Sequence, residues 1–510
     1  MLRKIRIVLG AVMFIGITLL FLDFTGTLHH WVGWMPKIQL LEAVLAVNVI
    51  VVAALVLLTL VLGRIYCSVI CPLGILQDVF GWLGKKVRKN RYSYSKEVRW
   101  LRYPVLVLFV AALLAGVGTV VQLLAPYSAF GRIATTLLQP VWKACNNLLA
   151  AVAEHVDSYA FYHVDAIVPH IGLVTAIAAV TLVILFVLAW RNGRTYCNTI
   201  CPVGTVLSLL SRWSWLKIRF DADKCKSCSL CSKNCKASCI DFKTHSVDYS
   251  RCVVCGDCID SCKHGALAYQ AHQTHEAHKA HETHKPHKTH KTHEPNKPHD
   301  ADGLSRRSFL LSAALATTAA LAQEAKKTDG GLAEIEDKVA PERQTPIVPP
   351  GARSKQNFEQ HCTGCQLCVS KCPNQVLRPS SDWSHLMLPT MSYELGYCRP
   401  ECYRCSEVCP AGAIIPISAE DKASTQIGHA VWIKKNCIPL TDGVECGNCA
   451  RHCPTGAIEM VPSDPDDEES PYVPAVNESR CIGCGACENL CPARPFSAIY
   501  VEGHEVHKEI

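Results

Sequence analysis

Six cysteine motifs constrain the fold of this chain more than any other feature of its sequence. Of the 30 cysteines in 510 residues, 24 fall into groups of four that end in the spacing Cys-x2-Cys-x3-Cys. Three cysteines this close together wrap a turn of backbone around one face of a [4Fe–4S] cluster, and the fourth reaches a neighbouring cluster. Zinc ribbons use two separated pairs instead, so the spacing favours iron–sulfur clusters over zinc and over a disulfide scaffold. We therefore expect six [4Fe–4S] clusters.

Residues 214–270 carry the first two motifs and predict a two-cluster, ferredoxin-like α+β domain. Their cysteines are Cys225, Cys228, Cys231 and Cys235, then Cys252, Cys255, Cys258 and Cys262. Exchange of the fourth cysteine between motifs would give Cys262 to the first cluster and Cys235 to the second. Lys236 and Lys263 follow these fourth cysteines in place of the usual proline, which removes a turn signal but no ligand. Cys239 and Cys145 are left over and have no assigned role.

Residues 356–510 carry the other four motifs and predict a four-cluster domain of the same α+β type. Their cysteines are Cys362, Cys365, Cys368 and Cys372; Cys398, Cys402, Cys405 and Cys409; Cys437, Cys446, Cys449 and Cys453; and Cys481, Cys484, Cys487 and Cys491. A proline and a short strand-like stretch follow the fourth cysteine of each of these four motifs, as repeated ferredoxin halves require. The gaps between motifs are 25, 27 and 27 residues, too alike to show which motifs exchange their fourth cysteine. Nested and sequential pairings both stay open.

Four apolar runs in residues 1–213 are each long enough to cross a bilayer, which takes about 20 residues. They cover roughly residues 5–23, 42–62, 104–125 and 168–190. Basic residues precede the first run and fill the connection between the second and third, whereas few lie between the third and fourth. By the positive-inside rule, both ends of this region face the cytoplasm. We expect an α-helical membrane bundle of four spans, and the alternative is a set of buried helices in a soluble protein.

An internal repeat lies within this region. Gly-Arg-x-Tyr-Cys-x3-Cys-Pro-x-Gly occurs at residues 63–74 and again at residues 193–204, where its cysteines are Cys67, Cys71, Cys197 and Cys201. A Cys-x3-Cys pair places two thiols about one helical turn apart on one face, which suits a shared metal or a redox thiol pair at the membrane edge. The alternative is a helix-exit turn with buried, inert cysteines.

A low-complexity segment and an export signal separate the two cysteine-rich regions. In residues 271–303 a histidine falls at every third position from His272 to His293, so no core can form and we expect a disordered or extended spacer; metal capture by the histidines is the alternative. Residues 304–323 contain Arg306 and Arg307, a modest apolar run and a small-residue end at Ala322. This pattern is typical of a twin-arginine export signal. Residues 324–355 form a second linker, and the sequence leaves open whether Ala322 marks a cleavage site or the end of a fifth span.

These motifs together resemble a known pair of proteins. Residues 1–270, with the apolar runs, the duplicated Cys-x3-Cys-Pro and two cluster motifs, resemble the NapH-type membrane ferredoxin of periplasmic nitrate reduction. Residues 304–510, with the twin-arginine signal and four cluster motifs, resemble its exported NapG-type partner. The resemblance implies a quinol dehydrogenase component of the bacterial inner membrane that takes electrons from the quinone pool. Residues 323–510 would then lie in the periplasm and serve a reductase or cytochrome there, after passage through the twin-arginine export machinery.

Other chemistries lack sequence support. The chain has no haem-attachment motif, P-loop or dinucleotide fingerprint, and its net charge of +7 gives no reason to expect a nucleic-acid partner. Electron transfer is therefore the expected function, although a bilayer core about 30 Å thick separates cytoplasmic clusters from exported ones. A diffusing quinol, or a redox centre made by the four repeat cysteines, would have to bridge that distance. Two rival functions remain: a metal-reducing maturation factor for a respiratory oxidase, and a wholly cytoplasmic, membrane-anchored polyferredoxin.

Overall fold

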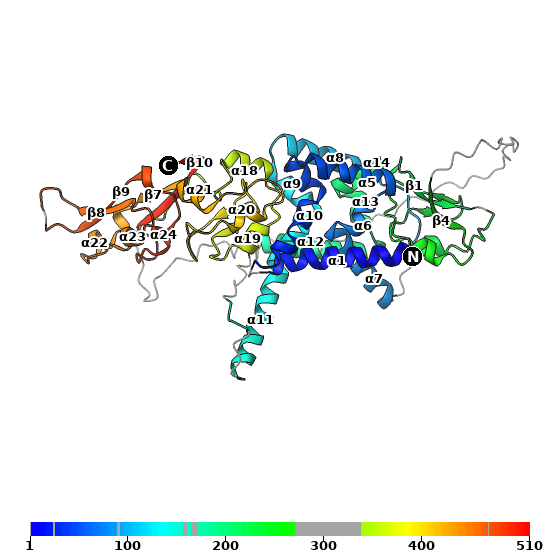
Figure 1. Ribbon diagram of the computed structural model, residues 1–510, viewed down its shortest axis with the longest axis horizontal. Helices are drawn as coiled ribbons and strands as arrows, with labels where there is room; N and C mark the ends of the chain where they lie inside the picture. Colours follow the sequence, from blue (N-terminus) through cyan, green and yellow to red (C-terminus); the bar gives the residue numbers. More distant parts are fainter. Residues whose placement is uncertain are drawn as a thin grey trace, which may run out of the picture. The chain divides into compact units, whose positions relative to one another are not determined.

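The computed structural model describes residues 2–23, 26–88, 92–156, 161–164, 172–221, 223–271, 338–467 and 469–510 (Figure 1). Almost all of the His-rich segment 271–303, the whole twin-arginine segment 304–323 and the first part of the linker 324–355 lie outside the described residues. Helices dominate the N-terminal 213 residues, and small two-stranded sheets occur only in the cysteine-rich parts among the described residues.

Two of the described helices are long and apolar enough to cross a membrane. They are α1 (Leu2–Leu22) and α12 (Leu173–Asn192). Only 33% of the most apolar stretch of α1 and 22% of that of α12 is buried, so most of their apolar side chains face outward. Gly193, with a φ of 69°, ends α12 in a backbone conformation that other residues rarely adopt.

The predicted four-span bundle is wrong, because two of the four apolar runs are broken. The run at 42–62 forms α4 (Leu40–Leu45) and α5 (Val49–Leu62), separated at Val47, which has a φ of 53°. The run at 104–125 forms α8 (Arg99–Leu114) and α9 (Gly118–Leu124), separated at Gly116, which has a φ of 73°. The longer pieces have 14 and 16 residues, or about 21 and 24 Å, short of a bilayer core of about 30 Å.

The internal repeat folds in the same way twice. In the first copy α5 is followed by α6 (Tyr66–Val69) and α7 (Pro72–Arg88); in the second α12 is followed by α13 (Thr195–Thr199) and α14 (Pro202–Ser211). Each motif proline is the first residue of its last helix, where a missing backbone N–H removes no helical hydrogen bond.

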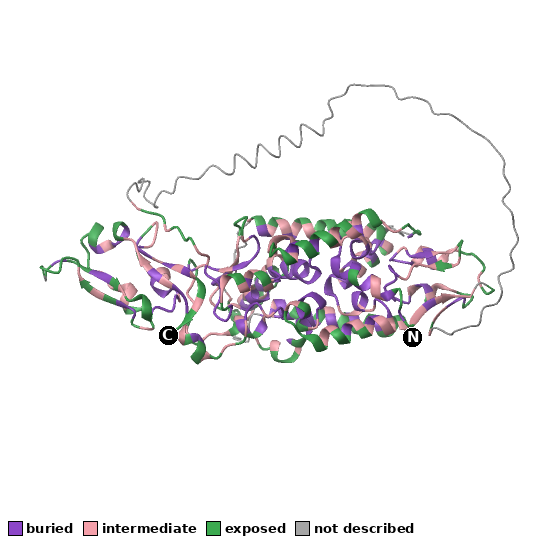
Figure 2. Ribbon diagram, turned by 90° about the horizontal axis from the view of Figure 1, so that it is seen from above, coloured by how far each residue is buried: buried purple, intermediate pink, exposed green. Residues whose placement is uncertain are grey.

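Four more described helices and one π-helical turn complete the N-terminal region. They are α2 (His29–Val32), α3 (Trp34–Lys37), α10 (Pro126–Ile133) and α11 (Gln139–Glu154), with a π-helical turn at Ala134–Leu138. Phe21, Tyr127 and Phe130 are almost fully buried. The ring centroids of Tyr127 and Phe130 lie 6.0 and 6.2 Å from the ring centroid of Phe21. Figure 2 shows the buried residues concentrated toward the middle of the helical region and exposed residues along its outer helices.

Residues 214–271, the two-cluster segment, form the small α+β unit that the sequence predicts. Strand β1 (Leu216–Phe220) pairs antiparallel with β4 (Leu267–Ala271), with Leu216 opposite Ala271. Between them lie α15 (Leu230–Asn234), β2 (Ile240–Asp241), β3 (Ser246–Val247) and α16 (Asp257–Ser261).

Residues 338–510, the four-cluster segment, repeat the same pattern of short helices and paired strands. The pairs are β5 (Leu377–Pro379) with β6 (Pro389–Met391), β7 (Thr425–Trp432) with β10 (Ile499–Glu509), and β8 (Ile458–Pro462) with β9 (Tyr472–Val476). The helices are α18 (Lys355–His361), α19 (Leu367–Lys371), α20 (Arg404–Val408), α21 (Ala419–Ser424), α22 (Ile438–Thr441), α23 (Asn448–Arg451) and α24 (Ala486–Asn489), with 3-10 turns at Lys434–Asn436 and Glu478–Arg480.

Helix α1 contacts both cluster-bearing segments. Near its first turn, Arg3 forms an ion pair of 3.0 Å with Asp257 of the two-cluster segment. Directly after its last turn, buried Asp23 accepts a 2.8 Å hydrogen bond from Lys371 of the four-cluster segment. A 21-residue helix is about 31 Å long, so the two segments contact opposite ends of a membrane-length helix.

Candidate cluster sites and the duplicated cysteine motif

The four motifs with standard spacing share one backbone conformation. The residues on either side of the second cysteine have positive φ angles. These residues are Ser227 and Ser229, Val254 and Gly256, Gly364 and Gln366, and Gly483 and Gly485. Half of them are not glycine, and such residues adopt this conformation only where their surroundings hold them in it. Successive N–H groups in a turn of this kind form a concave site for an anion, including an iron–sulfur cluster.

The sulfurs of several fourth cysteines also accept backbone hydrogen bonds. The N–H groups of Ala266, Val376, Ala457 and Ala498 donate to the sulfurs of Cys262, Cys372, Cys453 and Cys491 at 3.2–3.3 Å. Hydrogen bonds of this kind stabilise a thiolate. The donors and the turns therefore fit [4Fe–4S] clusters, for which the cysteines would supply the thiolate ligands.

In the two-cluster segment, the structure brings together the cysteines that the exchange of fourth cysteines predicts. One small cavity is lined by Cys225, Cys228, Cys231 and Cys262. For the other set, burial raises the pKa of Cys258, and the charges of Cys255 and Cys235 raise it further. Cys239 lies beside this second set, because its sulfur is 3.5 Å from that of Cys235.

In the four-cluster segment, the fourth cysteines of the first two motifs each lie near the leading cysteines of the other motif. Burial raises the pKa of each leading cysteine of the first motif, and the charge of Cys409 raises it further. These leading cysteines are Cys362, Cys365 and Cys368. Burial also raises the pKa values of Cys398 and Cys405 in the second motif, and the charge of Cys372 raises both further.

The fourth cysteines of the third and fourth motifs likewise lie near the leading cysteines of the other motif. A small cavity is lined by Cys437, Cys446, Cys449 and Cys491. Burial raises the pKa values of Cys481 and Cys484, and the charge of Cys453 raises both further. These neighbours favour a sequential pairing, first with second and third with fourth, over the nested one.

The two copies of the repeat are joined by their arginines. Arg64 donates to the carbonyl of Cys197 at 3.3 Å, and Arg194 donates to the carbonyl of Cys67. Both guanidinium groups have no exposed surface. The exchange brings Cys67, Cys71, Cys197 and Cys201 into one buried region.

The role of these four cysteines in metal or redox chemistry stays a prediction. Within the described ranges, no three His, Cys, Asp or Glu side chains converge closely enough to hold a single metal ion. The sulfur of Cys197 accepts a 3.2 Å hydrogen bond from Gln77, and the sulfur of Cys201 accepts one of 3.3 Å from the N–H of Gly204.

A buried carboxylate fixes the second copy of the repeat to its surroundings. Asp78 of α7 accepts from Arg194 at 2.7 Å, from Arg6 of α1 at 2.8 Å and from Lys236 of the two-cluster segment at 2.7 Å. Lys236 directly follows Cys235. The residue that replaces the usual proline therefore links a cluster motif to the helices.

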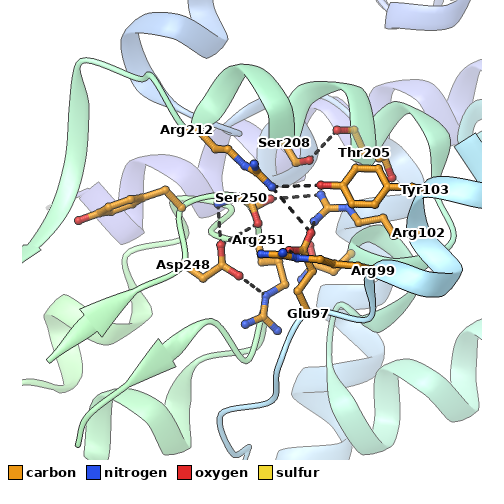
Figure 3. A network of polar contacts seen from close by, with 12 residues as sticks. Glu97, Arg99, Arg102, Tyr103, Thr205, Ser208, Arg212, Asp248, Ser250 and Arg251 are labelled. Atoms are coloured by element: carbon orange, nitrogen blue, oxygen red, sulfur yellow. Dashed lines mark hydrogen bonds and ion pairs between the residues drawn. The ribbon is translucent and has the colours of Figure 1, made fainter. Parts of the chain in front are cut away.

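A second polar network holds the other motif of the two-cluster segment against α8 (Figure 3). The backbone carbonyl of Ser250 accepts from Arg64 at 2.8 Å and from Arg102 at 3.3 Å. Arg102 also donates to Glu97 at 2.7 Å, and Asp248 accepts from Arg251 at 2.7 Å. Since Ser250 precedes Cys252 by two residues, these contacts position the start of that motif.

Two family models match the chain. A 4Fe-4S binding domain matches residues 44–90 and 172–221, which contain both copies of the repeat. A 4Fe-4S dicluster domain matches residues 361–413 and 444–494, which contain every cysteine of the last four motifs except Cys437. Each dicluster match covers one of the two motif pairs.

Several curated proteins are similar to parts of the chain. The ferredoxin-type protein NapF of Escherichia coli K12 is 31% identical over 160 residues, which are 31% of this chain and 87% of NapF. The methylamine utilization ferredoxin-type protein MauM of Methylobacillus flagellatus is 31% identical over 166 residues, 32% of this chain and 70% of MauM. This chain belongs to the ferredoxin-type proteins. The putative electron transport protein YccM of Escherichia coli K12 is 29% identical over 241 residues, 45% of this ferredoxin-type protein but only 60% of YccM.

These similarities make the ferredoxin-type protein an iron–sulfur electron-transfer protein with [4Fe–4S] domains. The relatives named above are of the NapF and MauM types, so the predicted fusion of NapH-type and NapG-type proteins stays a prediction. Sequence reasoning overlooked Arg64, Gln77, Asp78 and Arg194. The matching Gly-Arg pairs at the start of each repeat were the signal for the two arginines, whereas nothing local marks Gln77 or Asp78.

Proposed function

We propose that this ferredoxin-type protein takes electrons from the membrane quinol pool and passes them through its [4Fe–4S] clusters to a periplasmic reductase or cytochrome. A nitrate-reductase-like system is the setting that the resemblance to NapH-type and NapG-type proteins favours. The arrangement of the two cluster-bearing segments around α1 and α12 carries the proposal.

Helix α12 also contacts both cluster-bearing segments, but it has the four-cluster segment at its start and the two-cluster segment at its end. Near its start, Val174 packs with Leu386 and Met387 of the four-cluster segment. After its end, the N–H of Arg194 donates to the carbonyl of Lys236 in the two-cluster segment at 2.8 Å. Each helix thus has the two-cluster segment at one end and the four-cluster segment at the other, as expected if the segments lie on opposite sides of a membrane.

The surface of the helical region supports a membrane location. Exposed valine, leucine, isoleucine and phenylalanine side chains occur along both α1 and α12, and large exposed apolar surfaces mark membrane or protein interaction sites. Exposed tryptophans form two groups, one in and beside the helices near the two-cluster segment and one directly after α1. They are Trp82, Trp100, Trp213 and Trp215, and Trp31 and Trp34. Tryptophan is enriched at both membrane–water interfaces.

The redox balance is simple. Oxidation of one quinol to the quinone releases two electrons and two protons, and each [4Fe–4S] cluster takes one electron while the protons pass to water. The protein's own part is to hold the clusters through its thiolates and to anchor both cluster-bearing segments to α1 and α12. Arg64 and Arg194 also keep the four cysteines of the repeat buried between the two copies.

The test uses the full-length, iron-loaded protein in detergent. Menadiol added without oxygen should bleach the visible absorbance of part of the clusters, and dithionite should bleach the remainder. Bleaching by dithionite with no bleaching of any cluster by menadiol or decylubiquinol would contradict the proposal. Reduction of Cu(II) by the dithionite-reduced protein, without any response to quinol, would favour the metal-reductase alternative.

A further inference from the structure

A groove of about 660 Å³ lies between α1 and α7, within the range of small-molecule sites. Its walls include Ile7, Ala11 and Phe14 of α1 and Val79 and Trp82 of α7. Ile7 and Trp82 are 46% and 58% exposed. The groove therefore opens on the apolar outer face of the helices.

The inner part of the groove is polar, and two of its buried atoms lack partners. Arg6 is 7% exposed and Gln77 is 1% exposed, and both line the groove. Among the described residues, Nε of Arg6 and Oε1 of Gln77 have no hydrogen-bond partner. A buried polar group without a partner is costly, so the residues that line the inner part of the groove include an N–H donor and a carbonyl acceptor with unused hydrogen-bonding capacity.

The same groove contacts both candidate redox regions. Lys236 and Asp257 line it, and each is the neighbour of a cluster cysteine, Cys235 and Cys258. On the other side, Nε2 of Gln77 donates to the sulfur of Cys197 at 3.2 Å. A ligand in the groove would thus lie beside the first motif pair and beside the duplicated cysteine motif.

We propose that this groove binds the headgroup of a quinone or quinol, a placement that rests on the proposed function. One ring oxygen accepts from Nε of Arg6, the hydroxyl of the quinol donates to Oε1 of Gln77, and the tail lies along the apolar walls toward Trp82. A quinol has a headgroup with a hydrogen-bond acceptor and a donor, and an apolar tail. It therefore matches the polar inner part and the apolar outer walls of the groove.

A phospholipid shares the polar head and apolar tail, and the lysines and arginines at the inner end would attract its phosphate. The experiment therefore tests both a quinone and a phospholipid as ligands. The full-length protein is photolabelled with an azidoquinone, in competition with decylubiquinone or with phosphatidylglycerol, and the labelled peptides are identified by mass spectrometry. This readout does not depend on the clusters.

We expect label on residues 6–15 and 75–82, displaced by decylubiquinone and not by phosphatidylglycerol. Ala11→Trp, which fills the groove, should abolish this label, whereas the matched Val183→Trp on the exposed face of α12 should not. Gln77→Leu should weaken binding about tenfold, the loss expected for one buried hydrogen bond. Label elsewhere, displacement by the phospholipid alone, or full labelling of Ala11→Trp would overturn the proposal.

Failure of this site and failure of the proposed function give different results. If the label maps to the groove but menadiol reduces no cluster, the quinone site stands and the electron-transfer route fails. If menadiol reduces clusters while the label maps elsewhere, the route stands and this site is wrong.

Discussion

Arg194 joins three parts of the protein through one fully buried side chain. Its guanidinium contacts Asp78 of α7 and the carbonyl of Cys67, and its backbone N–H donates to Lys236. Removal of one partner from a buried ion pair typically destabilises a protein by about 3–5 kcal/mol, because the other charge stays buried. Asp78 would retain Arg6 and Lys236, which limits the loss.

We therefore expect Arg194→Ala to lower the free energy of unfolding by about 3 kcal/mol, measured by chemical denaturation in detergent. Arg191→Ala is the matched control, because Arg191 lies one turn earlier in α12 and is exposed. Its effect should stay within about 0.5 kcal/mol. Equal effects of the two substitutions would show that the buried arginine contacts do not stabilise the repeat.

At the scale of elements, the break between α4 and α5 depends on a residue that is poorly suited to it. Val47 has a φ of 53° and is 75% exposed, and a β-branched residue in this region is strained by about 1–3 kcal/mol. Glycine relieves the strain but loses about 0.5–1 kcal/mol to its greater freedom when unfolded. Val47→Gly should thus stabilise the protein by about 1 kcal/mol.

Val49→Gly provides the control for this prediction. Val49 is 70% exposed and begins α5, so glycine there should destabilise the protein by up to about 1 kcal/mol. Denaturation midpoints of the two variants should move in opposite directions. A loss of stability in both would mean that the strain at Val47 is not released.

The sequential pairing of motifs makes a prediction that iron analysis can test. Cys362→Ala and Cys409→Ser should each remove the same cluster, so the double variant should lose about four iron atoms per chain. Cys362→Ala with Cys372→Ser affects two different clusters, and that double variant should lose about eight. A nested pairing would not give this pattern, and equal iron loss in both double variants would contradict the sequential one.

The sequence marks the cluster motifs because ligand spacing is a local property, and a 4Fe-4S family model matches the region of the last four motifs. It predicted the apolar runs by composition, which counts residues but does not detect a backbone break. Asn48 and the Gly116-Val117-Gly118 stretch were the available signals for the two breaks. The contact between Gln77 and Cys197, 120 residues apart, comes from tertiary packing and has no local signal.

At the scale of the whole molecule, the ion pair of Arg3 with Asp257 and that of Lys371 with Asp23 tie the two cluster-bearing segments to opposite ends of α1. If α1 and α12 cross the membrane, the two-cluster segment faces the cytoplasm by the positive-inside rule. The four-cluster segment then faces the periplasm. That placement requires export of residues 338–510, for which the predicted twin-arginine signal would provide the route.

A matched pair of protease sites tests this topology. A specific cleavage site is inserted either in the exposed β8–β9 connection at residues 463–467 or in the β2–β3 turn at residues 243–244. In intact spheroplasts we expect protease to cut the first site and to reach the second only after lysis, as seen on immunoblots. Lysine in place of Arg306 and Arg307 should protect the first site, because twin-arginine export needs the pair. Protection of both sites until lysis in the unsubstituted protein would instead place every cluster in the cytoplasm and contradict the proposed electron path.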